Sequence, residues 1–273
     1  MFSLTFDYWS SIATKSFLTL TIHFIDQDFK LKDYVLKTIE VRDSHTGENT
    51  AKIINTVLEE FNIKFKAGLG TFAVSDAARN MKKTAIELSL PHLCCFAHIL
   101  HNTLIKSFEE IEISTLISKA HKLAIYFRSS PKKTNVLIDM QNKLKLKNIK
   151  LKLDVETRWN STYDMIERLL GNKIPIINLA LEDKNIENLN LTGSEWEDAL
   201  AVKELLGPFK IISDLLCSSG NPSISLLQPL IFNIGNNLLK EVPYDNPLIK
   251  LLKKAMNKNF CAEFLSMMMY QSY

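Results

Sequence analysis

The beginning of the chain alternates apolar and polar side chains, a pattern typical of β-strands. The alternation covers residues 2–9 and, more regularly, 17–24, and a third strand is expected over 34–41. The breaks between these runs are short, so the pattern predicts an antiparallel meander. Side chains repeat every second residue along a strand, which places Asp7 and Trp9 on the same face of the first strand.

The pattern then changes to a helical period. Apolar residues recur at helical spacing through residues 51–62, which predicts an amphipathic helix. Two short apolar runs, at 72–74 and 90–93, are expected to form the fourth and fifth strands, and each is followed by a helix-prone segment. From Cys95 onward the pattern is helical. The predicted order is therefore βββαβαβα, followed by further helices.

The second half of the chain is expected to be largely α-helical. An apolar stripe runs from 113 to 127 and is broken before Pro131, because proline disfavours helix in the preceding residue. The lysine-rich residues 143–152 fit either a basic strand or a loop, and a solvated face is favoured over a DNA-facing one. Thr192 or Ser194, with a glutamate three positions on, predicts a capping box at the start of another helix.

The composition is that of a soluble globular protein, since 46% of the 273 residues are hydrophobic and 23% are charged. The formal net charge of +3 is compatible with a nucleic-acid partner but does not by itself indicate one. No apolar run is long enough to span a bilayer and no cleavable leader is recognisable, so no membrane partner is expected. Four cysteines without a disulfide framework favour a reducing compartment.

Candidate chemistry gathers where the predicted strands end. Asp76 follows the fourth strand, and His98 lies in the first turn of the helix after the fifth. Both could face one edge of the sheet, where open α/β sheets place their sites, and Asp7 of the first strand is the expected partner. Taken singly, Asp76 also fits a helix N-cap and Asp7 an exposed strand residue. Cys95 and His98 share a helix face but lack the second half of a zinc site.

Five short pieces follow one another along the chain: TFDYWS at 5–10, HTGEN at 45–49, SDAARNM at 75–81, CFAHILHN at 95–102 and TRWNS at 157–161. None is specific alone, but in this order over residues 3–260 they resemble the catalytic region of hAT-superfamily transposases and their domesticated relatives, the BED-type zinc-finger proteins. The resemblance implies an RNase H-like α/β core over 1–128 and a helical insertion-like region over 129–260. Residues 261–273 are Met-rich and change character abruptly, so they are expected to form a divergent tail outside the organised fold.

The resemblance also implies a metal site. In this family two aspartates and a distant glutamate hold two divalent cations, Mg²⁺ or Mn²⁺, which activate water or a DNA 3′ hydroxyl for phosphoryl transfer. By match, Asp7 and Asp76 are the two aspartates, and both are expected to be catalytic and metal-binding. Carboxylate oxygens suit such hard cations, and paired metals stabilise the attacking and leaving oxygens.

Other matched positions imply contacts with DNA. His98 corresponds to a catalytic residue that approaches the scissile phosphate, and Trp9 to an aromatic residue that stacks on an unpaired or flipped base. Arg158 and Trp159 match an Arg-Trp pair expected to bind nucleic acid. Taken singly, Trp9, Trp159 and Trp196 also fit core positions, a reading that is favoured for Trp196 and left open for Trp9.

The chain also departs from the family pattern. Ala77 follows Asp76 where the family usually has asparagine, and no candidate is found for the third acid, since Glu263 lies in a different sequence context. A site with two acids is expected to hold metal weakly or not at all. No Cys/His set has zinc-finger spacing, so no zinc is expected in this chain.

These features together predict a transposase-derived nuclear protein that contacts DNA or chromatin-associated partners and is catalytically inactive. A homodimer through a C-terminal segment absent from this chain is also expected from the resemblance. Two alternatives remain open. One is a fragment of an active transposase that performs metal-dependent DNA cleavage and strand transfer. The other is a protein-interaction scaffold without DNA binding, because a fold alone does not determine function.

Overall fold

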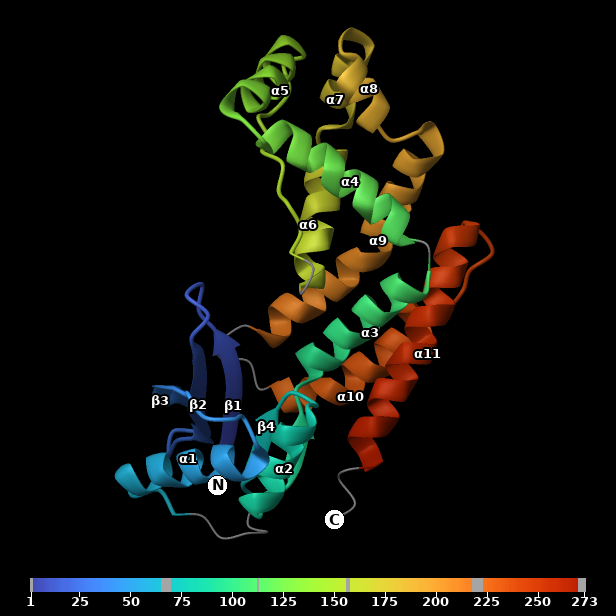
Figure 1. The fold of residues 1–273 in the computed structure, drawn as a ribbon. Coiled ribbons are helices and arrows are strands. Elements are labelled where there is room, and N and C mark those ends of the chain that lie inside the picture. The colour runs from blue at the N-terminus through green and yellow to red at the C-terminus, as the bar shows by residue number, and fades with distance from the viewer. Residues whose placement is uncertain (1, 65–69, 112, 156–157, 218–222, 270–273) are drawn as a thin grey trace. The chain divides into compact units, whose positions relative to one another are not determined.

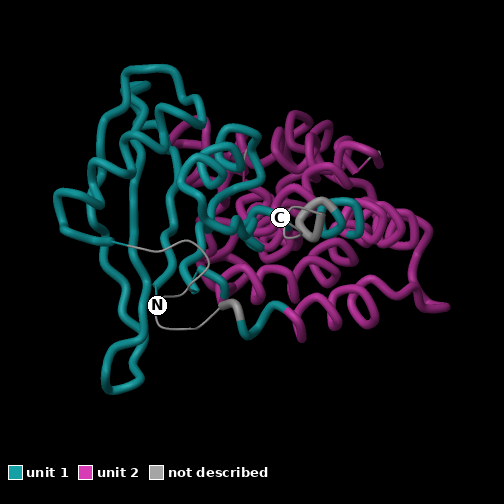
Figure 2. The backbone as a smooth tube through the Cα atoms, turned by 90° about the horizontal axis from the view of Figure 1, so that it is seen from below, with its two compact units in different colours: residues 1–99, 216–227, 261–273 teal, residues 100–215, 228–260 magenta. Residues whose placement is uncertain are grey.

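The computed structural model describes residues 2–64, 70–111, 113–155, 158–217 and 223–269, and Figure 1 labels most of their helices and strands. The chain forms two compact units, coloured separately in Figure 2. The first contains residues 1–99, 216–227 and 261–273, and the second contains 100–215 and 228–260.

The first unit is built on a five-stranded mixed sheet. Its order is β3-β2-β1-β4-β5. The first three strands pair antiparallel, and β4 and β5 continue the sheet in parallel. The predicted meander and the α/β, RNase H-like class with a helical second half are therefore confirmed. The strands are β1 (Phe2–Ser10), β2 (Ser16–Ile25), β3 (Leu31–Glu40), β4 (Phe72–Ser75) and β5 (His92–Cys94).

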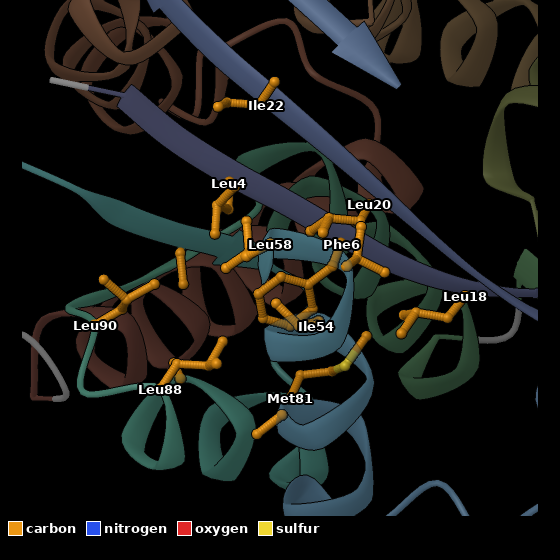
Figure 3. Packing of buried hydrophobic residues seen from close by; sticks show 14 of the residues in the cluster. Leu4, Phe6, Leu18, Leu20, Ile22, Ile54, Leu58, Met81, Leu88 and Leu90 are labelled. Carbon is orange, nitrogen blue, oxygen red and sulfur yellow. The ribbon is translucent and has the colours of Figure 1, made fainter. Parts of the chain in front are cut away.

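One face of this sheet forms the core of the first unit. Leu4 and Phe6 of β1 are at most 1% exposed and pack with α1 (Gly47–Glu60) and α2 (Arg79–Glu87) (Figure 3). Burial of each such side chain contributes on the order of 1.5–3 kcal/mol. Because the even positions of β1 point into this core, its odd positions lie on the opposite face.

The α1 helix packs closely on α2. Thr46 caps α1, since its side chain accepts a hydrogen bond from the Asn49 backbone N–H at 3.2 Å. Gly47 follows, and a Cβ atom at that position would lie 2.3 Å from Cγ of Lys83 and 3.0 Å from the backbone nitrogen of Thr84. The close approach of the two helices therefore requires glycine at residue 47.

The second unit is helical. The predicted core position of Trp196 is confirmed by its 2% exposure. The predicted capping box is also present, because the Thr192 hydroxyl accepts from the Glu195 backbone N–H and the Glu195 carboxylate accepts from the Thr192 backbone N–H. From α3 onward the elements are α3 (Phe96–Glu110), α4 (Ile113–Arg128), α5 (Pro131–Lys143), α6 (Trp159–Leu170), α7 (Lys173–Glu182), α8 (Lys184–Leu189), α9 (Gly193–Leu216), α10 (Ser223–Asn233), the π-helix η1 (Ile234–Leu238) and α11 (Pro247–Met269), and the unit boundaries fall within α3, α9, α10 and α11.

The predicted break before Pro131 is confirmed, because α4 ends at Arg128 and α5 begins at Pro131 with Ser130 as N-cap. The structure differs from the sequence-based expectations at two places. The compact units divide at 99/100, whereas the sequence placed a boundary at 128. The tail expected at 261–273 is wrong for residues 261–269, which continue α11 because alanine, leucine and methionine favour helix. Residues 270–273 lie outside the described part.

Candidate functional site

The two candidate acids lie at the same edge of the first unit. In the parallel pairing of β1 and β4, Thr5 is the partner of Val74, and Asp7 and Asp76 each follow two residues later. Asp7 lies on the side of the sheet away from the core, as an exposed residue. Burial of its carboxyl group nevertheless raises the pKa of Asp7 above 3.8, and the negative charge of Asp76 raises that pKa further. The register therefore puts the two aspartates at the same end of neighbouring strands, and the charge of Asp76 acts on Asp7.

The Asp76 side chain stabilises the turn between β4 and α2. Its Oδ1 accepts a hydrogen bond from the Ala78 backbone N–H at 3.0 Å, the geometry of an Asx turn. The N-cap position of α2 is Ala78, so the alternative role of Asp76 as the N-cap itself is not observed. The turn uses Oδ1 and fixes the orientation of the carboxylate.

His98 lies beside the two acids on the first turn of α3. A hydrogen bond with the Cys95 side chain raises the pKa of His98 to about 9, and the charges of Asp7 and Asp76 act in the same direction against burial. The raised pKa favours the protonated form of the imidazole at neutral pH. Burial alone would raise the pKa of Cys95, but the hydrogen bond and positive charge of His98 lower it overall. A fixed positive charge beside two carboxylates suits contact with a phosphate oxygen.

A second histidine, not predicted from the sequence, is hydrogen-bonded to the last residue of β4. His92 Nε2 and Ser75 Oγ are 2.8 Å apart, and both residues are buried. Ser75 Oγ donates to the Asp76 carbonyl at 3.2 Å, which leaves it to accept from His92. Burial lowers the pKa of His92 to about 4, so this histidine is neutral where His98 is charged. Sequence patterning gave no signal for it, because a lone histidine in a strand has no periodic partner.

Trp9 forms an exposed aromatic platform on the same strand as Asp7. Its ring stacks on Phe17 with centroids 4.7 Å apart, and its Nε1 donates to Thr19 Oγ1 at 3.0 Å. These two contacts fix the ring, yet 46% of the residue is exposed. Trp9 therefore has the rigidity and the open surface that stacking on a base requires.

The HTGEN motif is joined to the same strand. The His45 ring stacks on Tyr8 with centroids 4.1 Å apart, and its Nε2 lies 3.0 Å from Ser16 Oγ. The Asn80 side chain donates to the His45 carbonyl at 2.9 Å. Residues of three separate motifs are therefore in contact, by ring stacking and by a hydrogen bond. These contacts give the motifs a structural role in positioning β1.

The matched Arg-Trp pair lies in the second unit. Arg158 is exposed and immediately precedes α6. Trp159 is only 2% exposed, so it is a core residue and presents no ring face on which a base could stack. Its burial argues against the nucleic-acid contact predicted at this position. The sequence alone does not decide whether Trp159 is buried, because a tryptophan at the start of a helix can point inward or outward.

The chemistry of the donor set decides which metal the site suits. Within the described residues no group of three His, Cys, Asp or Glu side chains could hold a metal ion. Burial raises the pKa of Cys94, and the negative charges of Glu263 and Asp76 raise it further. Two carboxylates still fit Mg²⁺, which commonly binds one or two carboxylates and completes its shell with water and substrate phosphates.

Family models match both parts of the chain. The ZBED1 RNase-like domain matches residues 5–103, and the ZBED1 RNase-like helical domain matches residues 93–205. No helix in the described part of the chain has the length and apolar character needed to cross a membrane.

Individual relatives agree with these matches. The chain is 26% identical to a putative AC transposase of Zea mays over 95% of its own length and 34% of the relative's. It is 30% identical to the Hobo transposase of Drosophila melanogaster over 85% of its own length and 33% of the relative's. It is 23% identical to zinc finger BED domain-containing protein 4 of Homo sapiens over 91% of its own length and 22% of the relative's. The chain thus spans about a third or less of the length of these relatives. With its mixed sheet, helical second unit and matched domain pair, the chain belongs to the hAT-type transposase family, which includes transposase-derived BED zinc-finger proteins.

Proposed function

We propose that this chain is a nuclear DNA-binding module that holds a DNA phosphate, with a weakly bound divalent cation, at the edge formed by β1 and β4. The observation that carries the proposal is geometric: Asp7 and Asp76 each follow the paired residues Thr5 and Val74 of β1 and β4 by two positions, and His98 lies in the first turn of α3. Asp7 and Asp76 would hold Mg²⁺ or Mn²⁺, and His98 and Trp9 would contact the phosphate and a base. When bound, the cation would polarise a phosphoryl oxygen.

We further propose that the chain does not complete DNA cleavage. Two-metal catalysis needs enough carboxylates to hold both ions, and the described residues supply a pair and not a triad. The relatives named as transposases support DNA as the partner, and the names of the BED-type relatives are consistent with a retained module.

Cation binding tests the site directly. Mn²⁺ titration followed by electron paramagnetic resonance, with a duplex DNA present, should show one weak site. Asp7→Asn and Asp76→Asn should each abolish it. Asp33→Asn is the matched control, because Asp33 is exposed on β3, two strands away from β1 in the sheet order. Equal Mn²⁺ binding in Asp76→Asn and in the control would refute the metal assignment.

Cleavage and DNA binding separate the alternatives. A labelled duplex incubated with Mg²⁺ or Mn²⁺ should remain uncut by the chain and by Asp76→Asn alike. Cleavage by the chain that Asp76→Asn abolishes would establish an active nuclease. Absence of any salt-dependent DNA binding would instead favour the protein-interaction scaffold, because phosphate contacts release counterions and weaken as salt rises.

A further inference from the structure

Positive charge is concentrated in one stretch of the second unit. Residues 128–152 contain eight lysine or arginine residues and one acidic residue, Asp139, a net charge of +7. The whole chain carries +3, so the remaining residues together carry −4. The mild overall charge therefore conceals a strongly basic segment in an otherwise acidic chain.

The lysine segment, residues 143–152, begins with the last residue of α5 and continues as an irregular connection whose backbone is hydrogen-bonded to the second unit. In Figure 1 it lies in the yellow-green trace that leads from the end of α5 to α6. The Gln141 and Asn172 side-chain amides both donate to the Ile149 carbonyl, at 2.9 and 3.1 Å. Arg128 Nη1 donates to the Leu151 carbonyl at 3.2 Å, and Leu151 is 5% exposed. These bonds fix the backbone along which the lysines are arranged.

The lysines themselves point to solvent. Lys143 at one end lies 3.8 Å from Glu182, and Lys152 at the other lies 2.8 Å from Asp164. Between these ends, Lys145, Lys147 and Lys150 are exposed and form no ion pair with the described residues. Three exposed lysines, close in sequence and without acidic partners among the described residues, form a positively charged surface that attracts an anionic partner.

Lys145 also occupies a backbone position that favours glycine. Its N–H donates to the Asn142 carbonyl at 3.0 Å and the Leu146 N–H to the Gln141 carbonyl at 2.9 Å, which is a Schellman motif ending α5. Lys145 has φ of 55° there, a conformation that glycine adopts without steric cost and a lysine does not. An unpaired lysine at a strained position is consistent with a use for its charge.

We propose that Lys145, Lys147 and Lys150 form a second DNA-binding surface that contacts backbone phosphates without reading sequence. This inference rests on the proposed function for DNA as the partner but uses residues distant in sequence from Asp7 and Asp76. Lysine acts as a point charge on phosphate and carries no base code. A lipid surface is disfavoured, because membrane-binding segments present a broad apolar face and the large exposed hydrophobic residue within this segment is Leu146, at 39%.

The experiment replaces Lys145, Lys147 and Lys150 together by glutamine in the full chain. Fluorescence anisotropy with two duplexes of unrelated sequence, over a series of KCl concentrations, measures affinity. We expect the affinity for both duplexes to fall about tenfold or more at 0.1 M salt. The slope of log K against log salt should become shallower by roughly 2.7, because each phosphate contact contributes about 0.9.

A matched control removes the same charge from the first unit. Lys30, Lys52 and Lys64 are exposed and form no ion pair with the described residues, so their triple glutamine variant should retain affinity and slope. Equal losses in the two triple variants would reduce the effect to net charge and overturn the proposal. Unchanged DNA affinity in the first triple variant, or loss only of binding to phosphatidylserine vesicles, would also overturn it.

Two further variants separate this inference from misfolding and from the proposed site. Lys145→Gly relieves the positive φ, so its melting temperature should equal or exceed that of the parent while DNA affinity falls. Retained affinity in this variant and in the triple variant would refute the surface. Asp76→Asn should lose Mn²⁺ binding, whereas the lysine triple variant should keep it, so failure of the site and failure of the lysine surface give different results.

Discussion

Replacing Gly47 by alanine separates two opposite expectations. The close packing of α1 on α2 predicts a loss of stability, whereas helix propensity predicts a gain. Gly47 is the first residue of α1, and Gly193 is the first residue of α9. Each follows a threonine whose side chain accepts a hydrogen bond from a backbone N–H: Thr46 from that of Asn49, and Thr192 from that of Glu195. Propensity alone predicts that alanine stabilises each helix, by up to about 1 kcal/mol.

The two glycines differ in their surroundings. A Cβ atom at Gly47 would lie 2.3 Å from Cγ and 2.6 Å from Cβ of Lys83, with the Thr84 backbone nitrogen at 3.0 Å. Because Cβ of Lys83 is fixed to the backbone, α2 itself must move, and overpacking of this kind costs typically about 1–3 kcal/mol. At Gly193 nothing in the described part of the chain lies within 4 Å of the added atom.

We therefore expect Gly47→Ala to lower the free energy of unfolding by roughly 1–2 kcal/mol and Gly193→Ala to leave it unchanged or slightly higher. Urea unfolding followed by circular dichroism, with each unit's transition fitted separately, measures both. A stabilised Gly47→Ala variant would show that α1 and α2 do not approach as described, and the explanation of the HTGEN glycine would be wrong.

Three further predictions concern titration and capping. The pKa of His98 is raised from 6.5 to about 9, so its proton adds stability that is complete below pH 6.5 and lost as pH rises through 9. An NMR titration should show this pKa and its fall in Asp76→Asn, and an ordinary histidine pKa would contradict the cluster. The pKa of His92 is lowered from 6.5 to about 4, so stability should decrease as pH falls from 6.5 towards 4, and His92→Gln should lessen that decrease in an acid-unfolding series. Thr192→Ala removes the capping box with Glu195 and should cost about 1 kcal/mol in the second unit's unfolding transition, whereas no loss would mean that solvent replaces the cap.

The sequence predicted the sheet well because its signal is local. Alternation along residues 2–9 and 17–24 directly reports a strand with one buried face, and the structure has strands there. The prediction that Asp7 lies near Asp76 used the same periodicity, together with the rule that open α/β sheets place their sites at strand ends. In the structure both residues follow the paired Thr5 and Val74 by two positions. Their roles in metal and DNA binding stay predictions.

Other features depend on tertiary packing that no single stretch encodes. Trp159 and Trp9 are both tryptophans in matched motifs, yet one is 2% and the other 46% exposed. The support of Asp76 by Ser75 and His92 joins two strands that are adjacent only in the folded sheet. The Met-rich end of the chain was misjudged because an abrupt change of composition resembled a tail, whereas its residues are good helix formers.

The alignment of β1 with β4 also explains why Asp7 and Asp76 keep their relative positions. A slip of β1 by a single residue would turn Phe6 out to water and Asp7 into the apolar interior, an exchange that the first unit could not tolerate. The spacing of the two acids is thus maintained by the requirement to fold. The two aspartates would stay at one edge of the sheet, whether or not they bind a metal, for as long as this sheet remains stable.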